Sequence, residues 1–123
     1  MPTIVHFDIS ADDIERAKRF YVELLGWKFQ PLPGPADYYL IETTDLDNQP
    51  GVGGGMAKRD KPEDKIINYI AVKSLDEYVA KVVELGGKLV GPKSTVPGWG
   101  YSAACLDTEG NIFGLWEDDK NAK

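Results

Sequence analysis

The same order of local signals occurs twice in this chain, and this repetition limits the fold more than any other feature of the sequence. Residues Pro2–Ile9 alternate in the way that is typical of a strand, and residues Ile66–Lys73 are expected to form the corresponding strand. A helix signal follows each stretch, beginning near Ser10 and near Ser74, and three shorter strand-like stretches follow each helix. The sequence therefore predicts an α+β fold built from two tandem βαβββ modules.

The duplication also predicts the boundaries within a single domain. We expect module one at residues 1–58, a charged linker at 59–65, module two at 66–118 and a frayed tail at 119–123. Aligning the helix starts, Asp13 with Asp76, places His6 opposite Tyr69. The two modules are therefore expected to present corresponding residues at these positions.

Each predicted helix has a start signal and an apolar stripe. Ser10 is expected to cap the first helix in a capping box with Asp13, and Gly26 to end it. Apolar residues at spacings of three and four predict the side that faces the core in each helix. These are Ile14, Ala17, Phe20, Tyr21, Leu24 and Leu25 in the first helix, and Leu75, Tyr78, Val79, Val82 and Val83 in the second.

Two stretches of module one are rich in proline or glycine. The three prolines of residues 31–35 predict an irregular loop. Residues Gly51–Ala57 are not a phosphate-binding loop, since neither a Lys-Ser/Thr pair nor a helix follows them. We interpret them as a fourth strand whose glycines permit close approach of the backbone or leave room for a ligand.

Composition excludes several classes of function. The formal net charge of −6 argues against nucleic-acid binding, and short apolar runs argue against a membrane span. The lone Cys105 cannot form an internal disulfide bond and is interpreted as inert core, which fits a cytoplasmic protein. With one histidine and one cysteine, the chain cannot build a metal site on two histidines.

Three features together resemble the glyoxalase/bleomycin-resistance/dioxygenase (vicinal oxygen chelate) superfamily. They are the βαβββ repeat, the opening His6-Phe7-Asp8-Ile9 with its helix, and the turn and strand Asp107–Glu117. The resemblance covers nearly the whole chain. It implies curled mixed sheets around a cleft, with the helices on the outside.

The resemblance also implies where a metal ion would bind in metal-using members. His6 matches the first ligand position, Tyr69 stands at the second histidine, and Gly114 stands at the late glutamate. The first-module glutamate falls in the Gly53–Met56 run, which has no carboxylate. We therefore expect no cofactor and treat His6 as a weak metal candidate, although a divalent metal stays possible. The favoured interpretation of His6 is a cavity histidine bonded to a neighbouring side chain without a metal ion.

The alternation of side chains along the predicted strands then indicates which residues line the cleft. His6 and Asp8 share one face of the first strand, and Glu117 lies on the opposite face from Gly114, where a solvated strand end is expected. An unusual number of aromatic residues favours a pocket for a flat or apolar ligand, although core or dimer-interface roles are the alternative. The predicted ligand-binding residues are His6, Tyr39, Tyr69, Trp99, Tyr101, Gly114 and Trp116.

These observations lead to one preferred function and two alternatives. The preferred hypothesis is a homodimeric protein that binds a small apolar or aromatic molecule without a metal ion, in a sequestration or resistance role. The first alternative is a metal-dependent glyoxalase I-like lyase or isomerase, with a site completed across a dimer that could recruit Glu42 or Asp8. The second alternative is a protein-interaction or stress-response module.

Overall fold

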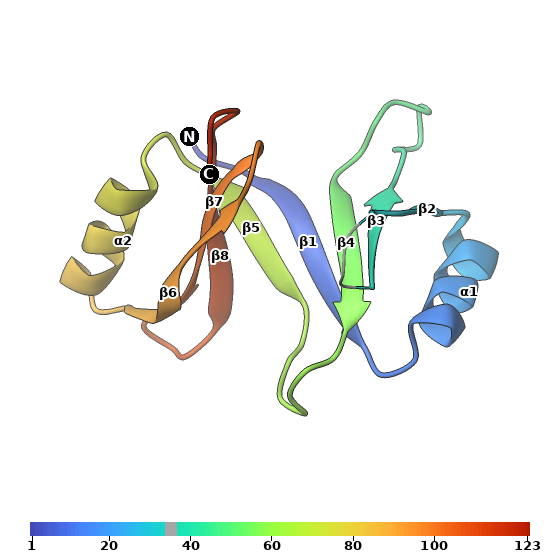
Figure 1. Cartoon of the computed structure of the whole chain (residues 1–123), viewed down its shortest axis with the longest axis horizontal. Coiled ribbons are helices and arrows are strands. Elements are labelled where there is room, and N and C mark those ends of the chain that lie inside the picture. The colour runs from blue at the N-terminus through green and yellow to red at the C-terminus, as the bar shows by residue number, and fades with distance from the viewer. Residues whose placement is uncertain (34–36) are drawn as a thin grey trace. The chain divides into compact units, whose positions relative to one another are not determined.

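The structure is a computed structural model that describes residues 1–33 and 37–123, so Gly34 and Pro35 of the proline-rich loop lie outside the described residues. The chain divides into two compact units (Figure 1). The N-terminal unit is His6–Ile66, and the C-terminal unit is Ile67–Lys123 together with Met1–Val5.

The N-terminal unit follows the predicted βαβββ order. It contains β1 (Ile4–Ala11, from His6 onward), α1 (Ile14–Leu25), β2 (Lys28–Pro31), β3 (Tyr38–Glu42) and β4 (Gly53–Lys58). The strand order is β2-β3-β4-β1. β1 pairs with β4 in parallel, while β2–β3 and β3–β4 are antiparallel. The glycine run is therefore a strand in the interior of this sheet, as predicted.

The C-terminal unit repeats the order. It contains β5 (Ile67–Ala71), α2 (Leu75–Glu84), β6 (Lys88–Val96), β7 (Gly100–Leu106) and β8 (Ile112–Asp118). The strand order is β5-β8-β7-β6, with β5 and β8 parallel and the remaining pairs antiparallel. The predicted α+β fold of two βαβββ modules is confirmed.

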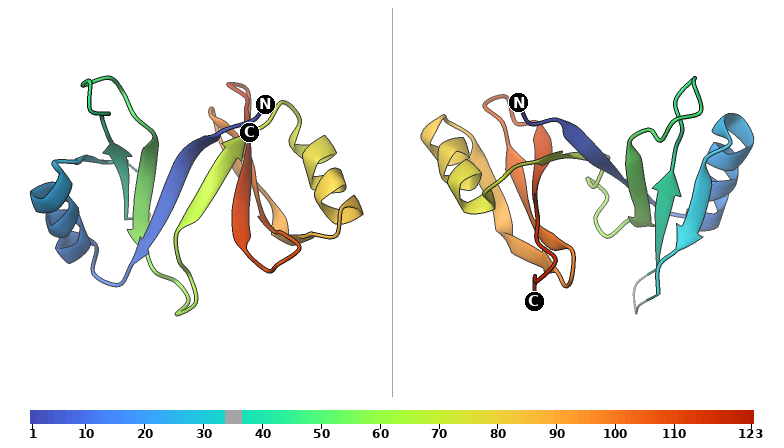
Figure 2. Two further views of the ribbon diagram at one scale, coloured as in Figure 1. Left: turned by 180° about the vertical axis from the view of Figure 1, so that it is seen from behind. Right: turned by 90° about the horizontal axis from the view of Figure 1, so that it is seen from above.

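Each helix covers one face of the sheet in its own unit (Figure 2). Buried residues of the N-terminal unit meet α1 through Ile14, Ala17 and Tyr21, and those of the C-terminal unit meet α2 through Tyr78, Val79 and Val82. The strand residues in these cores are Ile9, Ala11, Ile41 and Met56 in one unit, and Ala103, Cys105 and Leu115 in the other, where Val72, directly after β5, joins them. Residues that alternate with them face away from the helices.

The start of α1 differs from the prediction. Asp13, not Ser10, is the N-cap residue, and its carboxylate accepts a hydrogen bond from the Arg16 amide at 3.0 Å. Ser10 cannot take this role because β1 continues through Ala11. Gly26 ends the helix at a φ of 71°, a conformation that glycine adopts without strain.

The predicted apolar stripes are too wide. Phe20 and Leu24 are 58% and 63% exposed, and Leu25 and Val83 are also exposed. A helix that lies on a sheet buries one narrow side, so Tyr21 packs inward while its neighbour Phe20 remains at the surface. None of the helices in the part of the chain that the structure describes is long and apolar enough to span a membrane.

The last residues also differ from the prediction of a frayed tail. Ala122 is buried, and its carbonyl accepts a hydrogen bond from the Gly98 amide at 2.9 Å. Glu117 is not simply a solvated strand end, because its carboxylate accepts a hydrogen bond from the Leu75 amide at 2.7 Å. That amide is one of the unpaired donors at the start of α2, so Glu117 stabilises the helix terminus.

Candidate functional site

The alternation of β1 brings His6 and Asp8 to the same side of the N-terminal sheet. Ile9 is buried on the side that faces α1, and Phe7 packs against the same core. His6 and Asp8 alternate with these residues, so they lie on the side of the sheet away from the helix, as the sequence predicted.

The two side chains form a hydrogen-bonded trio with Tyr38 of β3. The Tyr38 hydroxyl donates to Asp8 Oδ1 at 2.7 Å, and His6 Nε2 lies 3.0 Å from the same oxygen. His6 Nε2 also lies 3.3 Å from the Tyr38 hydroxyl oxygen. Because a carboxylate oxygen accepts but does not donate, the short contact assigns the proton to His6 Nε2. Asp8 Oδ1 is therefore the shared acceptor of the trio.

Glycines of β4 make room for the trio. Asp8 lies opposite Gly55, and a Cβ built at Gly55 would overlap the Tyr38 hydroxyl and lie 2.7 Å from Asp8 Oδ1. The backbone at Gly55 is not in the left-handed region, so this glycine is required by space and not by conformation. By contrast, a Cβ at Gly53 would lie 3.4 Å from the Ile41 carbonyl oxygen, which is ordinary contact.

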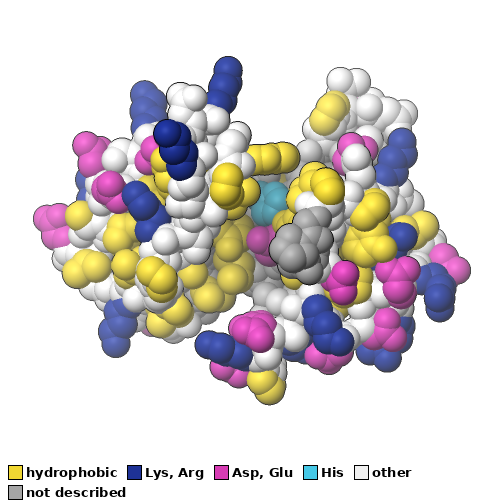
Figure 3. Space-filling model, viewed as in Figure 1, with side chains coloured by type: hydrophobic (Ala, Val, Ile, Leu, Met, Phe, Trp, Pro, Cys, Tyr) yellow, Lys and Arg dark blue, Asp and Glu magenta, His cyan; other side chains and the backbone are white. Residues whose placement is uncertain are grey.

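The trio is half-buried. The side chains of His6 and Asp8 are 31% and 34% exposed. The chain's single histidine is visible at the surface in Figure 3 (cyan). In the described part of the chain, the only ion pair recorded for Asp8 is with His6. The carboxylate is thus the formal charge at the centre of this site.

The donor set does not fit the divalent ion that metal-using members of such a fold hold. Within the described residues, no group of three His, Cys, Asp or Glu side chains is arranged to hold a metal ion. His6 Nε2 is committed to Asp8 and Tyr38. In the C-terminal unit, Gly114 lies opposite Tyr69, and a Cβ at Gly114 would overlap the Tyr69 ring. The Tyr69 ring therefore fills the space beside Gly114 where a glutamate side chain would begin.

The remaining predicted residues do not form one surface. Tyr39 lies on the helix-facing side, where its hydroxyl donates to Glu15 at 2.8 Å and its ring contacts Phe29. Tyr101 packs against the buried cluster of the C-terminal unit. Trp99 is 57% exposed in the turn before β7.

Trp116 alternates with the buried Leu115 and therefore lies on the same side of β8 as Gly114. Its indole nitrogen donates to Asp118 at 2.7 Å. Of the predicted ligand-binding residues in the C-terminal unit, Tyr69, Gly114 and Trp116 thus share one side of the sheet.

Two side chains of the C-terminal unit, Cys105 and Tyr101, have a raised pKa. Burial raises the pKa of the Cys105 thiol, which is 0% exposed, so this cysteine is an inert core residue as predicted. Burial and the nearby Asp119 carboxylate raise the pKa of Tyr101. Neither group has the lowered pKa of a nucleophile.

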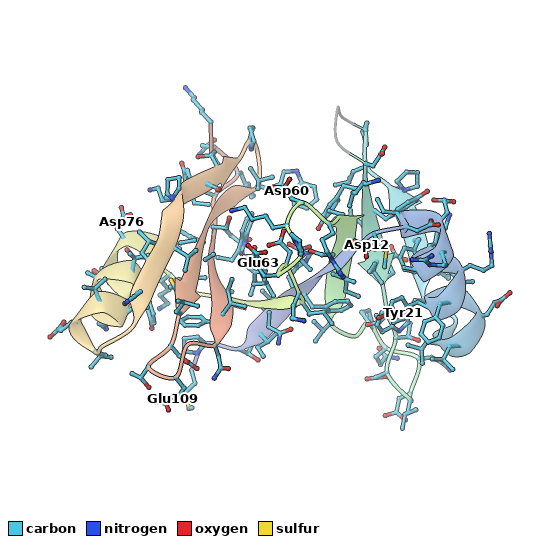
Figure 4. The ribbon with its side chains drawn as sticks, turned by 90° about the horizontal axis from the view of Figure 1, so that it is seen from below. Asp12, Tyr21, Asp60, Glu63, Asp76 and Glu109 are labelled. Carbon is cyan, nitrogen blue, oxygen red and sulfur yellow. The ribbon has the colours of Figure 1, made fainter. Side chains whose placement is uncertain are left out.

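Two hollows lie on the N-terminal unit. One hollow, of about 540 Å³, is bordered by the start of α1 and by β3. Its lining includes Tyr38, Tyr39 and Asp12, of which Asp12 is labelled in Figure 4. Another of about 420 Å³ is bordered by Trp27, Ile41 and the loop that leads to β4. Both volumes lie in the range of small-molecule sites. Tyr38 connects the trio to the first hollow.

Tyr38 is the functional residue that the sequence analysis missed. The pair Tyr38-Tyr39 occupies adjacent strand positions, so one ring must face α1 and the other must face away. The register of β3 on β4 decides which tyrosine reaches the trio. In this register Ile41 pairs with Gly54 and Leu40 pairs with Gly55. That register cannot be read from the sequence of β3 alone.

The repeated units and the histidine on β1 define a class of paired βαβββ proteins. Residues 3–44 match the family model described as bleomycin resistance protein-like N-terminal. A glyoxylase-like domain-containing protein of Didymella fabae is 34% identical over 117 residues, which cover 88% of this chain and 88% of that protein. The chain therefore belongs to the glyoxalase/bleomycin-resistance/dioxygenase (vicinal oxygen chelate) superfamily.

Other relatives extend the comparison. CFP32 of Mycobacterium bovis, which carries the name of a glyoxylase, is 31% identical over 124 residues. The match covers 93% of this chain but 45% of CFP32, so the chain spans about half the length of that relative. Among solved structures, a single-residue variant of Streptomyces coelicolor methylmalonyl-CoA epimerase superposes with a TM-score of 0.71 at 10% identity, covering 98% of this chain and 97% of the enzyme.

A superfamily member from Vibrio splendidus 12B01 gives a TM-score of 0.68 at 13% identity, covering 96% of this chain and 100% of that chain. At these identities the two solved structures show that the fold is shared.

Proposed function

We propose that this protein binds a small organic molecule through the His6–Asp8–Tyr38 trio, without a metal ion. The observation that carries the proposal is the shared acceptor: Asp8 Oδ1 engages both His6 Nε2 at 3.0 Å and the Tyr38 hydroxyl at 2.7 Å. A histidine used this way presents a proton, not a lone pair, at Nε2. Metal binding would have to break both contacts and recruit further ligands.

The aromatic residues support an apolar or aromatic body for the ligand. Tyr38 borders the trio and also the hollow of about 540 Å³. Tyrosine and tryptophan contribute large apolar areas and a polar group that fixes orientation. The proposed ligand therefore combines a flat apolar part with one polar group that reaches the trio.

Metal analysis and dye titration test this proposal together. We expect purified protein to carry no stoichiometric nickel, zinc or iron, and His6→Ala to leave metal content unchanged. A hydrophobic dye should bind the wild type, and Tyr38→Ala should weaken this binding. Stoichiometric metal that His6→Ala removes would contradict the metal-independent proposal.

A second candidate is an acid–base enzyme, and the trio itself favours it. A carboxylate, a phenol and an imidazole within hydrogen-bonding distance of one another can accept and donate protons at neighbouring positions. Relatives named for glyoxylase and epimerase activities point in the same direction.

Incubation with methylmalonyl-CoA in deuterium oxide, followed by proton NMR, tests for exchange of the proton next to the carbonyl. Exchange that Asp8→Asn abolishes would favour the enzyme. No exchange above that of a heat-inactivated sample would leave binding as the better function.

We also propose that the protein is a homodimer that acts in the cytoplasm. The free, buried Cys105 fits a reducing compartment such as the cytoplasm. Exposed apolar residues such as Phe20 and Leu24 are available for an interface. Light scattering should give twice the mass of 13.6 kDa, and a monomer mass at all concentrations would contradict the proposal.

A further inference from the structure

Only one of the two carboxylate oxygens of Asp8 accepts hydrogen bonds from the described residues. Both donors of the trio bind the same oxygen, Oδ1. Within the described residues, Asp8 Oδ2 has no recorded hydrogen bond, and it is not among the buried polar atoms that lack a partner. With the side chain 34% exposed, this oxygen faces water or a bound molecule.

The Arg59 guanidinium of the same unit interacts with groups other than Asp8. Arg59 Nη2 donates to the Ser10 carbonyl at 2.9 Å, and Nη1 lies 3.6 Å from the Asp12 carboxylate. The side chain that forms an ion pair with Asp8 is His6, which already donates to Oδ1. No lysine or arginine in the described residues is recorded in an ion pair with Asp8. An anionic ligand would therefore meet a carboxylate that no lysine or arginine of the described residues pairs with.

A metal site presents a positive charge to its ligand, whereas the Asp8 carboxylate presents a negative charge. A bound cation attracts ligand oxygens, whereas a carboxylate attracts N–H and O–H donors. The protein's formal net charge of −6 acts in the same direction, because it raises the local concentration of cations at the surface.

We infer that Asp8 Oδ2 recognises the donor group of the ligand, and that the ligand is an aromatic or apolar amine in its ammonium form. This inference rests on the proposed binding function. The ammonium group forms a charge-assisted hydrogen bond with Oδ2, while Tyr38 and His6 hold the carboxylate in place through Oδ1. A neutral hydroxyl ligand uses the same oxygen more weakly, and a carboxylate ligand is repelled.

Three probes with the same ring separate these cases: benzylammonium, benzyl alcohol and benzoate. Binding is followed by the backbone amide shifts of ¹⁵N-labelled protein, which also locate the site. We expect benzylammonium to shift amides of β1 and β4, including Phe7 and Gly55, with an affinity about tenfold or more above that of benzoate. Benzyl alcohol should lie between the two.

Substitutions assign the preference to Asp8. Asp8→Asn keeps the shape and removes the charge, so it should abolish the preference for benzylammonium. Asp76→Asn is the control, because Asp76 lies in the C-terminal unit outside the trio and both hollows, is 84% exposed and pairs with Lys93. It should leave the preference unchanged. If Asp8→Asn fails to fold, Asp8→Ser removes the same charge with a smaller side chain and should also abolish the preference.

Each contrary outcome has a distinct meaning. Benzoate binding at β1 and β4 as tightly as benzylammonium overturns the inference and leaves the proposed binding function standing. A preference that Asp8→Asn retains also overturns the inference, since another group must then carry it. If no probe shifts these amides, the inference is wrong, and stoichiometric metal in the same preparation would show that the proposed function has failed as well.

Discussion

The substitution Gly55→Ala tests the geometry of the trio with the smallest possible change. The added Cβ would overlap the Tyr38 hydroxyl and lie 2.7 Å from Asp8 Oδ1. Two responses are available. Either the strands shift to fit the extra atom, which costs about 1–3 kcal/mol, or the Tyr38 ring moves into solvent. The second response loses a hydrogen bond to a charged acceptor, which contributes about 1.5–3 kcal/mol.

Part of this cost is offset, because replacing glycine by alanine at an unstrained position stabilises a chain by about 0.4–1 kcal/mol through its unfolded state. We therefore expect Gly55→Ala to lower the free energy of unfolding by about 1–2 kcal/mol. Urea unfolding followed by tryptophan fluorescence measures this difference. Gly53→Ala is the matched control in the same strand, since its Cβ would lie 3.4 Å from the nearest atom. The control should change stability by less than about 0.5 kcal/mol.

A double-mutant cycle isolates the cause. In a Tyr38→Ala background the new methyl group meets no hydroxyl, so Gly55→Ala should cost little or become stabilising. The coupling energy between the two sites should then be about 1–2 kcal/mol. Equal stabilities of the Gly55→Ala and Gly53→Ala proteins would refute the reasoning, since Tyr38 could not then lie over Gly55.

Three further predictions concern the C-terminal unit. Gly114→Ala should destabilise the protein because its Cβ would overlap the Tyr69 ring, and Gly114→Glu should gain no nickel affinity in a titration. Hydrogen bonds from Asn111 and the Glu109 amide lower the pKa of Asp107. The ionised Asp107 therefore stabilises the folded state above the ordinary carboxyl pKa, and this stabilisation is lost as the pH falls through the lowered value. The stability difference between wild type and Asp107→Ala in urea should therefore shrink from pH 7 towards strong acid; a constant difference would contradict this. Cys105, which is 0% exposed with a raised pKa, should resist iodoacetamide at neutral pH until urea is added, and rapid labelling of folded protein would show that the core is open.

The sequence predicted the elements of the fold well because their signals are local. The alternation along β1 predicted that His6 and Asp8 share one face, and the structure places them there, opposite the buried Ile9. The N-cap of α1 was missed because Ser10 and Asp13 are both good cap residues, and the choice depends on where β1 ends. No pattern within the helix specifies that boundary.

The candidate site was predicted less completely, because it depends on contacts between distant residues. Tyr38 reaches Asp8 across a sequence separation of 30 residues, through the pairing of β3 with β4 and β4 with β1. Tyr39 was nominated instead, since either of two adjacent tyrosines is consistent with a strand. The ring of Tyr69 over Gly114 was missed for a related reason: the absence of a side chain at a glycine says nothing about which neighbour occupies the space.

The strand order of the C-terminal unit has a consequence for how this half of the protein folds. β8 is the last strand of the unit to be synthesised, yet it lies in the interior of the order β5-β8-β7-β6. Until β8 is present, β5 lacks its parallel partner, and the first amide of α2 lacks Glu117, which is 42 residues away. On the ribosome, β6 and β7 can pair as a local hairpin, but the remaining structure has to wait for non-local contacts that close long loops. Folding of this unit is therefore completed by its final strand, after translation has passed residue 118.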